Sequence, residues 1–278
     1  MKHTISTFQS TDGLKIHTES WLPDGEPKAI VIIVHGYAEH IGRYVHVAER
    51  LVQAGYAVYG LDHRGHGQSD GLRAHFDDFA HPVNDLKQYF DQIKAKHHEK
   101  KIFLWAHSMG SLIGLTFALR YQDELAGMVV SGTAVNGDET QPAPLIVVDR
   151  ILSKIIPKVA LIQALPATVL SHDPAIVSAY DSDPLNYRGK WRVLLGSLLI
   201  EAGQRIRARA GELRLPLLLL HGSDDQVVPK SGSEVIYQQA GSTDKTLKIY
   251  PGLYHEVHNE LEKEMVLNDA VNWLDQHS

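Results

Sequence analysis

The sequence predicts an α/β protein with a mostly parallel central sheet, helices on both faces and an inserted helical segment. Short apolar runs alternate with segments of helical length along most of the 278 residues, which is typical of βαβ units. The alternation stops between residues 137 and 215, where prolines interrupt helical patterns. We therefore expect a core of residues 1–136 and 216–278, with residues 137–215 inserted as a helical cap.

Most of the predicted strands are near-continuous Val, Ile and Leu runs, as in parallel strands covered on both faces. The strands are Lys15–Trp21, Ala29–Val34, Ala57–Asp62, Lys101–Ala106, Ala126–Ser131, Pro216–His221 and Thr246–Tyr250. The predicted helices between them are Arg43–Ala54, Asp85–Lys96, Ser108–Tyr121, Ser231–Ala240 and Glu260–Asp275. The first two strands are joined without room for a crossover helix, so we expect the sheet to start antiparallel.

Composition excludes several classes of protein. Apolar residues make up 44% and charged residues 22% of the chain, which excludes a disordered, collagenous or coiled-coil protein. With 27 Lys and Arg against 33 Asp and Glu, there is no basic excess to bind nucleic acid. The absence of cysteine excludes disulfides and a cysteine nucleophile. No apolar run approaches the ~18–20 residues of a membrane span, and no signal peptide is visible, so we expect a cytoplasmic protein.

The strongest local motif surrounds Ser108. A buried-looking strand runs into this serine and directly out into a helix, which is the pattern of the nucleophile elbow in α/β-hydrolases. Such a turn exposes the hydroxyl at the top of the sheet and needs small neighbours. Ala106 stands where the elbow motif has its first glycine. The alternative interpretation is that Ser108 is only a helix N-cap.

A serine hydroxyl is a weak nucleophile, and it needs a base that an acid holds in place. In this fold the acid follows the serine in the chain and the histidine comes last. Asp224 and Asp225 both follow the sixth predicted strand, and either could instead be a turn aspartate. His255 follows the last strand and is the expected base, whereas its rival His258 is expected inside the terminal helix.

An oxyanion hole requires two backbone N–H donors. One is expected from Met109, directly after the serine, and the other from Tyr37, in the loop after the second strand. Gly36 would let that backbone approach a substrate. The alternative is a simple glycine turn.

Other motifs are weaker. Gly65 and Gly67 are followed by Gly71, one residue late for a dinucleotide fingerprint. Asp62, His63 and His66 could be drawn as metal ligands, but their place after a buried strand favours a polar structural loop. No metal site is therefore predicted.

The inserted region bears on the substrate. Leu145–Ile156 and Val159–Leu165 mix apolar residues with sparse charges. These side chains could simply pack the cap onto the core. The sharper hypothesis is a lid whose inner face holds an acyl chain, with Ile151, Leu152 and Ile155 as substrate-binding residues, and whose outer face rests on a membrane or micelle.

Several motifs together resemble one family. They are His35-Gly-Tyr-Ala-Glu-His40 with Arg43-Tyr44, Leu61-Asp-His-Arg-Gly-His-Gly-Gln-Ser69, His107-Ser-Met-Gly110, Ser171-His-Asp-Pro with the residues to Leu185, His221-Gly-Ser-Asp-Asp225 and Tyr250-Pro-Gly-Leu-Tyr-His-Glu256. The chain resembles the monoacylglycerol lipase branch of the α/β-hydrolases, especially the bacterial enzymes. The resemblance covers nearly the whole chain. Ala106 and Ser111 depart from the glycines usual in that family.

The resemblance implies an α/β-hydrolase fold with a helical cap and a serine hydrolase that cleaves monoacylglycerols to fatty acid and glycerol. Its spacing, Gly-x-x-Asp-x-Val/Ile-x-Pro, favours Asp225 as the acid beside Ser108 and His255. It implies a lipid ester substrate and neither metal nor organic cofactor. The alternatives are a lysophospholipase or broad carboxylesterase, and a non-catalytic ligand-binding protein on the same fold.

Overall fold

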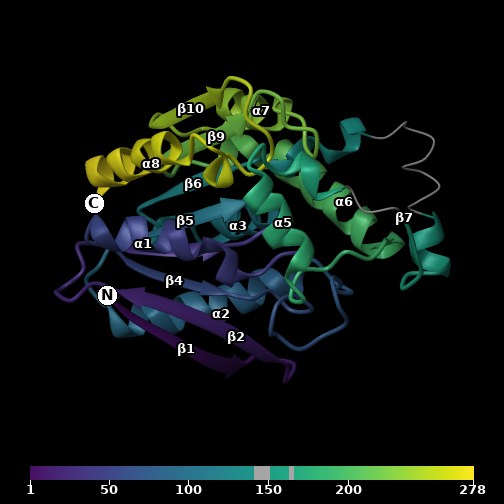
Figure 1. Ribbon diagram of the computed structural model, residues 1–278, viewed down its shortest axis with the longest axis horizontal. Coiled ribbons are helices and arrows are strands. Elements are labelled where there is room, and N and C mark those ends of the chain that lie inside the picture. The colour runs from purple at the N-terminus through teal and green to yellow at the C-terminus, as the bar shows by residue number, and fades with distance from the viewer. Residues whose placement is uncertain (141–150, 163–165) are drawn as a thin grey trace.

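The structure is a computed structural model and describes residues 1–140, 151–162 and 166–278. An eight-stranded sheet runs through its centre (Figure 1), in the order β1-β2-β4-β3-β5-β6-β9-β10. All neighbouring strands from β4 to β10 are parallel, while β2 pairs antiparallel with both β1 and β4. The strands of this sheet are β1 (Lys2–Gln9), β2 (Lys15–Leu22), β3 (Ile30–Val34), β4 (Ala57–Leu61), β5 (Ile102–His107), β6 (Gly127–Ser131), β9 (Leu217–Gly222) and β10 (Lys245–Tyr250).

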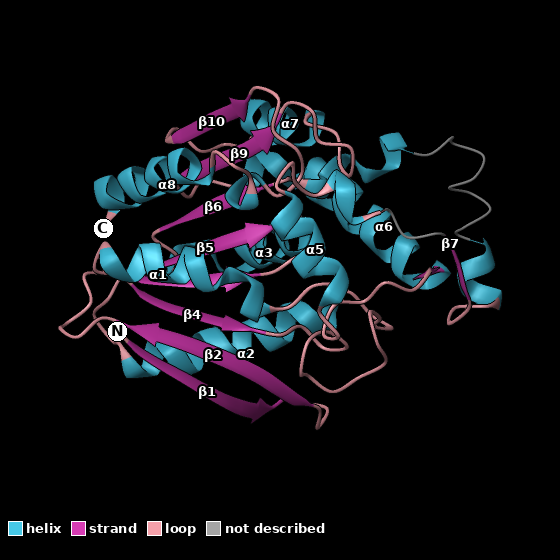
Figure 2. Ribbon diagram, viewed as in Figure 1, coloured by secondary structure: helices cyan, strands magenta, loops and turns pink. Residues whose placement is uncertain are grey.

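Helices cover both faces of this sheet (Figure 2). The described α-helices include α1 (Val45–Gln53), α2 (Ala80–Lys96), α3 (Met109–Tyr121), α5 (Pro174–Ser182), α6 (Val193–Arg209), α7 (Ser231–Gln239) and α8 (Lys263–His277). Short 3₁₀ turns are η1 (Ile41–Tyr44), η2 (Gln122–Glu124), η3 (Ala134–Thr140), η4 (Ala167–Val169), η5 (Ala210–Glu212) and η6 (Val257–Asn259). The α1 and α8 side chains share one apolar cluster, and those of α2, α3, α6 and α7 share another on the opposite face. The result is a three-layer arrangement with the sheet in the middle.

The predicted apolar runs form the strands, but three details differ from the expectations. The strand β1 was missed because seven of its eight residues are exposed, so it carries no apolar run. A small antiparallel pair, β7 (Ala160–Ile162) and β8 (Trp191–Arg192), lies in the region expected to be purely helical. His258 lies in the 3₁₀ turn η6 and not in α8, which begins only at Lys263.

The inserted region between β6 and β9 is not uniform. Its described elements include η3, the β7–β8 pair, η4, α5 and α6. The helix α6 buries Leu195, Ala202 and Ile206 in the same apolar cluster as α3, so this part of the insertion packs directly on the core. Figure 1 shows α5, α6 and β7 to the right of β5, on the side where the arrowhead of that strand lies.

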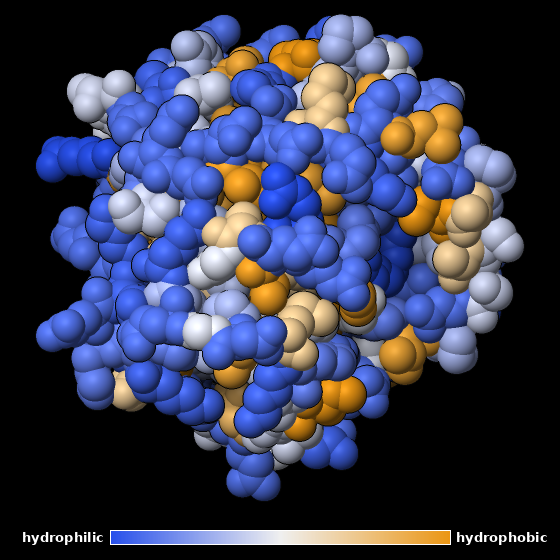
Figure 3. Space-filling model, turned by 60° about the vertical axis from the view of Figure 1, so that its left-hand side comes forward, coloured by the Kyte–Doolittle hydropathy of each residue, from blue (hydrophilic) through white to orange (hydrophobic). Residues whose placement is uncertain are grey.

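The face of the molecule shown in Figure 3 is mainly hydrophilic, with small groups of apolar residues scattered among polar ones. Scattered apolar residues are ordinary on a protein surface. Among the described residues, no helix is long and apolar enough to cross a membrane.

Candidate active site

Ser108 lies at a sharp bend between β5 and α3. Its backbone has φ 53° and ψ −120°, a conformation that few residues other than glycine adopt. Gly110 permits the bend, because a Cβ there would lie 2.1 Å from the carbonyl oxygen of Val34. Ala106 fits because Gly114 of α3 faces it: a Cβ on Gly114 would lie 3.0 Å from the Cβ of Ala106. The strand and the helix therefore meet closely enough to project the serine.

Ser111 supports the same bend and was not singled out as a functional residue. Its buried hydroxyl donates to the carbonyl oxygen of Ser108 at 2.6 Å and accepts the N–H of Ala134 at 3.0 Å. Ser111, which stands where the family usually has glycine, thus connects the elbow to the start of η3 by two hydrogen bonds.

His255 connects Ser108 with Asp225. Its Nε2 lies 2.9 Å from Ser108 Oγ, and its Nδ1 lies 2.7 Å from Asp225 Oδ2. The side chains of His255 and Asp225 are 3% and 1% exposed, so water barely reaches their bond. The three residues come from the ends of β5, β9 and β10, which parallel pairing brings to one edge of the sheet.

Electrostatics favour an ionised Asp225 beside His255. Burial disfavours its charge, but His255 and His221 hold the pKa of Asp225 well below its usual range. The N–H groups of Val227 and Val228 also donate to its Oδ1, at 2.8 and 3.0 Å. In His255, burial lowers the pKa, yet Asp225 outweighs this and raises it. The pair is therefore suited to holding a proton on the imidazole.

The two rival residues lie elsewhere. Asp224 is exposed, and its carboxylate accepts a hydrogen bond from the neighbouring Ser223. His258 is fully buried against Tyr44 and His107, and among the described residues no group bonds to either of its ring nitrogens. The structure thus brings Asp225 and His255, and neither rival, to Ser108.

The loop after β3 approaches Ser108 closely. A Cβ on Gly36 would lie 3.1 Å from the Cβ of Ser108, so glycine is needed there. Within the described parts of the chain, neither Tyr37 N–H nor Met109 N–H donates to a protein acceptor. Both predicted oxyanion donors therefore remain available to a substrate oxygen.

A cavity of about 330 Å³ opens over the serine. Its floor includes the three residues Gly36, Ser108 and His255. The other wall residues come from the loop of residues 35–40 after β3 (the oxyanion loop), the end of β5, the insertion, the loop after β9 and the loop of residues 251–256 after β10 (the histidine loop). They are Tyr37, Ala38, Glu39, His107, Pro166, Ala167, Leu170, Tyr180, Asp181, Tyr187, Arg188, Trp191, Val227 and Glu256. Sequence reasoning missed the Tyr187 and Trp191 wall; their aromatic character was the available signal.

The predicted cap residues do not line this cavity. Residues 151–155 are helical, with Ile151 54% and Ile155 69% exposed and Leu152 half-buried. Of the other residues in the predicted apolar stretches, 156 and 159–161 are described and do not line the cavity either, and 145–150 and 163–165 lie outside the described residues. The insertion contributes to the cavity through residues 166–191 instead.

The loop after β4 is held by its aspartate. Asp62 accepts the N–H of Ile41 at 2.8 Å and that of Gln68 at 2.7 Å, which fixes two loops beside each other. The backbone N–H of His63 donates to Nε2 of His35 at 2.9 Å. Over the described ranges, no group of three His, Asp or Glu side chains is arranged to hold a metal ion.

Comparison with known proteins agrees with this geometry. The profile of a hydrolase family described as serine aminopeptidase, S33, matches residues 25–262. A monoacylglycerol lipase from Mycolicibacterium smegmatis is 40% identical over 98% of this chain and 96% of its own length. The human monoglyceride lipase is 34% identical over 97% of this chain and 89% of its own.

A solved structure supports the same relation. The crystal structure of Paleococcus ferrophilus monoacylglycerol lipase has 30% sequence identity and a TM-score of 0.81, with all of both chains covered. The fold and the sequence comparisons lead to one conclusion: the chain belongs to this family of α/β-hydrolases and, within it, to the monoacylglycerol lipases.

Proposed function

We propose that the protein is a serine hydrolase that cleaves the ester bond of monoacylglycerols to a fatty acid and glycerol. The observation that carries the proposal is the hydrogen-bonded series Ser108–His255–Asp225 at the floor of a cavity with two free N–H donors. The names of the relatives indicate the substrate class.

In the first half of the reaction, Ser108 Oγ attacks the ester carbonyl carbon while His255 Nε2 takes its proton. Asp225 keeps the imidazole oriented and stabilises its charged form. The carbonyl electron pair moves onto oxygen, where the N–H groups of Tyr37 and Met109 bind it. When the intermediate collapses, the bond to glycerol breaks, and His255 returns its proton to the departing glycerol oxygen.

The acyl group then remains on Ser108. A water molecule takes the place of glycerol, gives its proton to His255 and attacks the acyl carbon. Collapse of this second intermediate breaks the Ser108 ester, releases the fatty acid and restores the serine hydroxyl.

The insertion has two roles in this proposal. Residues 137–215 act as the cap, and Leu170, Tyr187 and Trp191 supply apolar wall area for the substrate. The exposed side chains of Ile151, Ile155, Val159 and Leu161 meet a membrane or micelle from which the lipid is drawn. The protein acts in the cytoplasm and at membrane surfaces; cell fractionation tests this location.

The decisive experiment measures fatty acid release from monoacylglycerols by the wild type and by Ser108→Ala. We expect turnover in the wild type and a loss of several orders of magnitude in the variant. Lysophospholipids, diacylglycerols, p-nitrophenyl esters and an aminoacyl anilide, tested in parallel, separate a lysophospholipase, a broad esterase and a peptidase.

A fluorophosphonate probe distinguishes an enzyme from a ligand-binding protein on the same fold, because only an activated serine reacts rapidly. Labelling of Ser108 with no monoacylglycerol turnover would reject the substrate assignment alone. An absence of both labelling and turnover would reject the enzyme.

A further inference from the structure

Three buried charges lie beside the catalytic residues. Arg43 donates to Glu39 at 2.6 Å and to both carboxylate oxygens of Glu256 at 2.7 Å. The side chain of Arg43 is 9% exposed, and those of Glu39 and Glu256 are 3% exposed. Glu39 and Glu256 also form part of the cavity wall.

Each glutamate holds one of the two loops that the reaction needs. Glu39 accepts the N–H of Gly36 at 2.5 Å, directly before the oxyanion donor Tyr37. Glu256 follows His255 in the chain and also accepts from Asn259 at 2.7 Å. Arg43 therefore joins the oxyanion loop to the histidine loop, although Arg43 and Glu256 are 213 residues apart.

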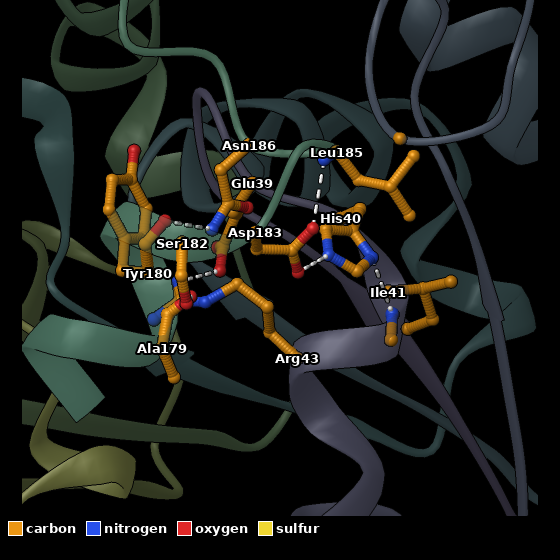
Figure 4. Close-up of polar contacts among 12 residues, drawn as sticks. Glu39, His40, Ile41, Arg43, Ala179, Tyr180, Ser182, Asp183, Leu185 and Asn186 are labelled. Carbon is orange, nitrogen blue, oxygen red and sulfur yellow. Dashed lines mark hydrogen bonds and ion pairs between the residues drawn. The ribbon is translucent and has the colours of Figure 1, made fainter. Parts of the chain in front are cut away.

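The cap meets the same arginine. The guanidinium of Arg43 lies 4.8 Å from the ring centre of Tyr180 in α5. Figure 4 shows the Arg43 side chain reaching towards Tyr180, with His40 and Asp183 joined nearby. His40 Nε2 and Asp183 Oδ2 are 2.8 Å apart, so the oxyanion loop is held from the cap side as well.

Stability alone does not explain such a cluster. Removing charges from water costs several kcal/mol per ion, and well-packed apolar residues often replace a buried ion pair without loss of stability. An ionic cluster does provide directional bonds that fix two loops against each other, and directional control matters most where reacting atoms must be aligned.

We propose that Glu39, Arg43 and Glu256 are positioning residues for the reaction at Ser108. Arg43 holds the loop that carries the Tyr37 N–H and the loop that carries His255 in one arrangement, and the Glu256 carboxylate favours the imidazolium that forms as the serine attacks. This inference rests on the proposed hydrolase function.

The charges around His255 support a role of Glu256 in stabilising the imidazolium. Burial lowers its pKa, and the carboxylates of Asp225, Glu256 and Glu39 raise it, with a net rise. Burial likewise disfavours the Glu256 carboxylate, but Arg43 lowers its pKa to about 2, so Glu256 is ionised at neutral pH.

The other groups near His255 are cationic or neutral. The ring of His107 lies 4.7 Å away, and its pKa is lowered by burial to about 3, so it is uncharged. Burial also lowers the pKa of His258 well below its ordinary value. Arg43 is a cation, and it is already bound to the two glutamates.

The test compares Glu256→Gln, Glu39→Gln and Arg43→Lys with the wild type, using p-nitrophenyl butyrate. The matched control is Asp85→Asn, which removes a buried carboxylate paired with Arg64, with no hydrogen bond to the triad. Circular dichroism and thermal unfolding show which variants fold, and kcat, KM and the pH dependence of kcat/KM are measured for these.

In Glu256→Gln we expect kcat to fall about 10- to 100-fold with KM within about threefold, since a small misplacement of reacting groups has effects of this size. The acid limb of kcat/KM should move to lower pH, because a carboxylate that raises the pKa of His255 is gone. Arg43→Lys should lower kcat similarly, since lysine cannot bridge both glutamates. Asp85→Asn should lower only thermal stability.

Wild-type kcat and an unmoved acid limb in Glu256→Gln would overturn the inference, as would an equal loss of kcat in Asp85→Asn. If Glu256→Gln does not fold, the kcat of Glu39→Gln decides in the same way. Ser108→Ala keeps the two proposals apart: full activity in that variant would reject the hydrolase mechanism itself, whatever the Glu256 variants do.

Discussion

Ser108 shows how single residues are adapted to one backbone conformation. Its positive φ stores strain of the order of 1–3 kcal/mol, which neighbouring contacts must offset. Gly110 gives the helix room to approach β3, and the Ser111 hydroxyl accepts one backbone N–H while donating to the elbow carbonyl. The family motif predicts this bend, but it does not reveal that Ser111 stabilises it.

Ala106 offers a direct test of the space behind the elbow. Ala106→Gly should keep near-normal kcat, since glycine satisfies every steric demand of alanine there. Ala106→Val should lower kcat at least 10-fold and stability by about 1–3 kcal/mol, because its extra methyl groups meet α3 at Gly114. Ester hydrolysis and urea unfolding check both effects. Normal activity in the valine variant would contradict the steric explanation.

The adjacent aspartates give a second prediction for single residues. Asp225→Asn should reduce kcat by about 10⁴, since the amide cannot hold the imidazole in its reactive tautomer. Asp224→Asn is the matched control and should stay within about threefold, because Asp224 is exposed and its carboxylate accepts a hydrogen bond from Ser223 and not from the triad. The reverse order of losses in kcat would show that Asp224 is the acid.

At the scale of elements, the predictable features are those that depend on local sequence. The strand β5 is buried along its length, so its apolar run is visible in the sequence. The exposed strand β1 cannot be recognised in this way, because its pairing with β2, and not the burial of apolar side chains, stabilises it. The bond between Arg43 and Glu256 joins residues far apart in the chain, so only the folded arrangement reveals it. The strand ends predicted His255 and the pair Asp224 and Asp225, and only the spacing of the family motif favoured Asp225.

The helical turn at residues 151–155 gives a prediction about lipid surfaces. Ile151→Ser with Ile155→Ser should lower kcat/KM for long-chain monoacylglycerol in micelles about 10-fold, since each buried CH₂ contributes roughly 0.8 kcal/mol. Hydrolysis of a soluble short ester should stay within about twofold. The control is Ile5→Ser on β1, which is 59% exposed and lies on an edge strand of the central sheet. Equal losses for both substrates would mean that these residues only stabilise the fold.

At the scale of the whole molecule, buried histidines surround the active site. Burial holds the pKa of His63 at about 3, that of His66 at about 4 and that of His107 at about 3. Burial also places the pKa of His35 and His258 well below the ordinary value of 6.5. The same burial that excludes water from the catalytic bonds therefore makes the fold sensitive to acid.

The sign of that sensitivity follows from proton counting. Below pH 6.5 the unfolded chain protonates these five histidines, whereas the folded chain keeps them neutral until a much lower pH. Each such histidine therefore lowers the free energy of unfolding by about 1.4 kcal/mol per pH unit as the pH falls from 6.5 towards 4. His255 and His17 have raised pKa values in the folded chain, so they change stability in the opposite sense at and above about pH 6.5 and add no slope well below it.

Urea unfolding between pH 7.5 and 5 tests this expectation. The urea midpoint should fall steadily below pH 6.5, whereas a flat or rising midpoint would contradict the histidine explanation. His66→Gln provides the matched comparison, because it removes one histidine whose pKa is lowered by burial and leaves the triad unchanged. The free energy of unfolding of this variant should therefore fall less steeply with decreasing pH than that of the wild type. The difference in slope should be at most that of one proton, about 1.4 kcal/mol per pH unit, whatever the stability at pH 7.5.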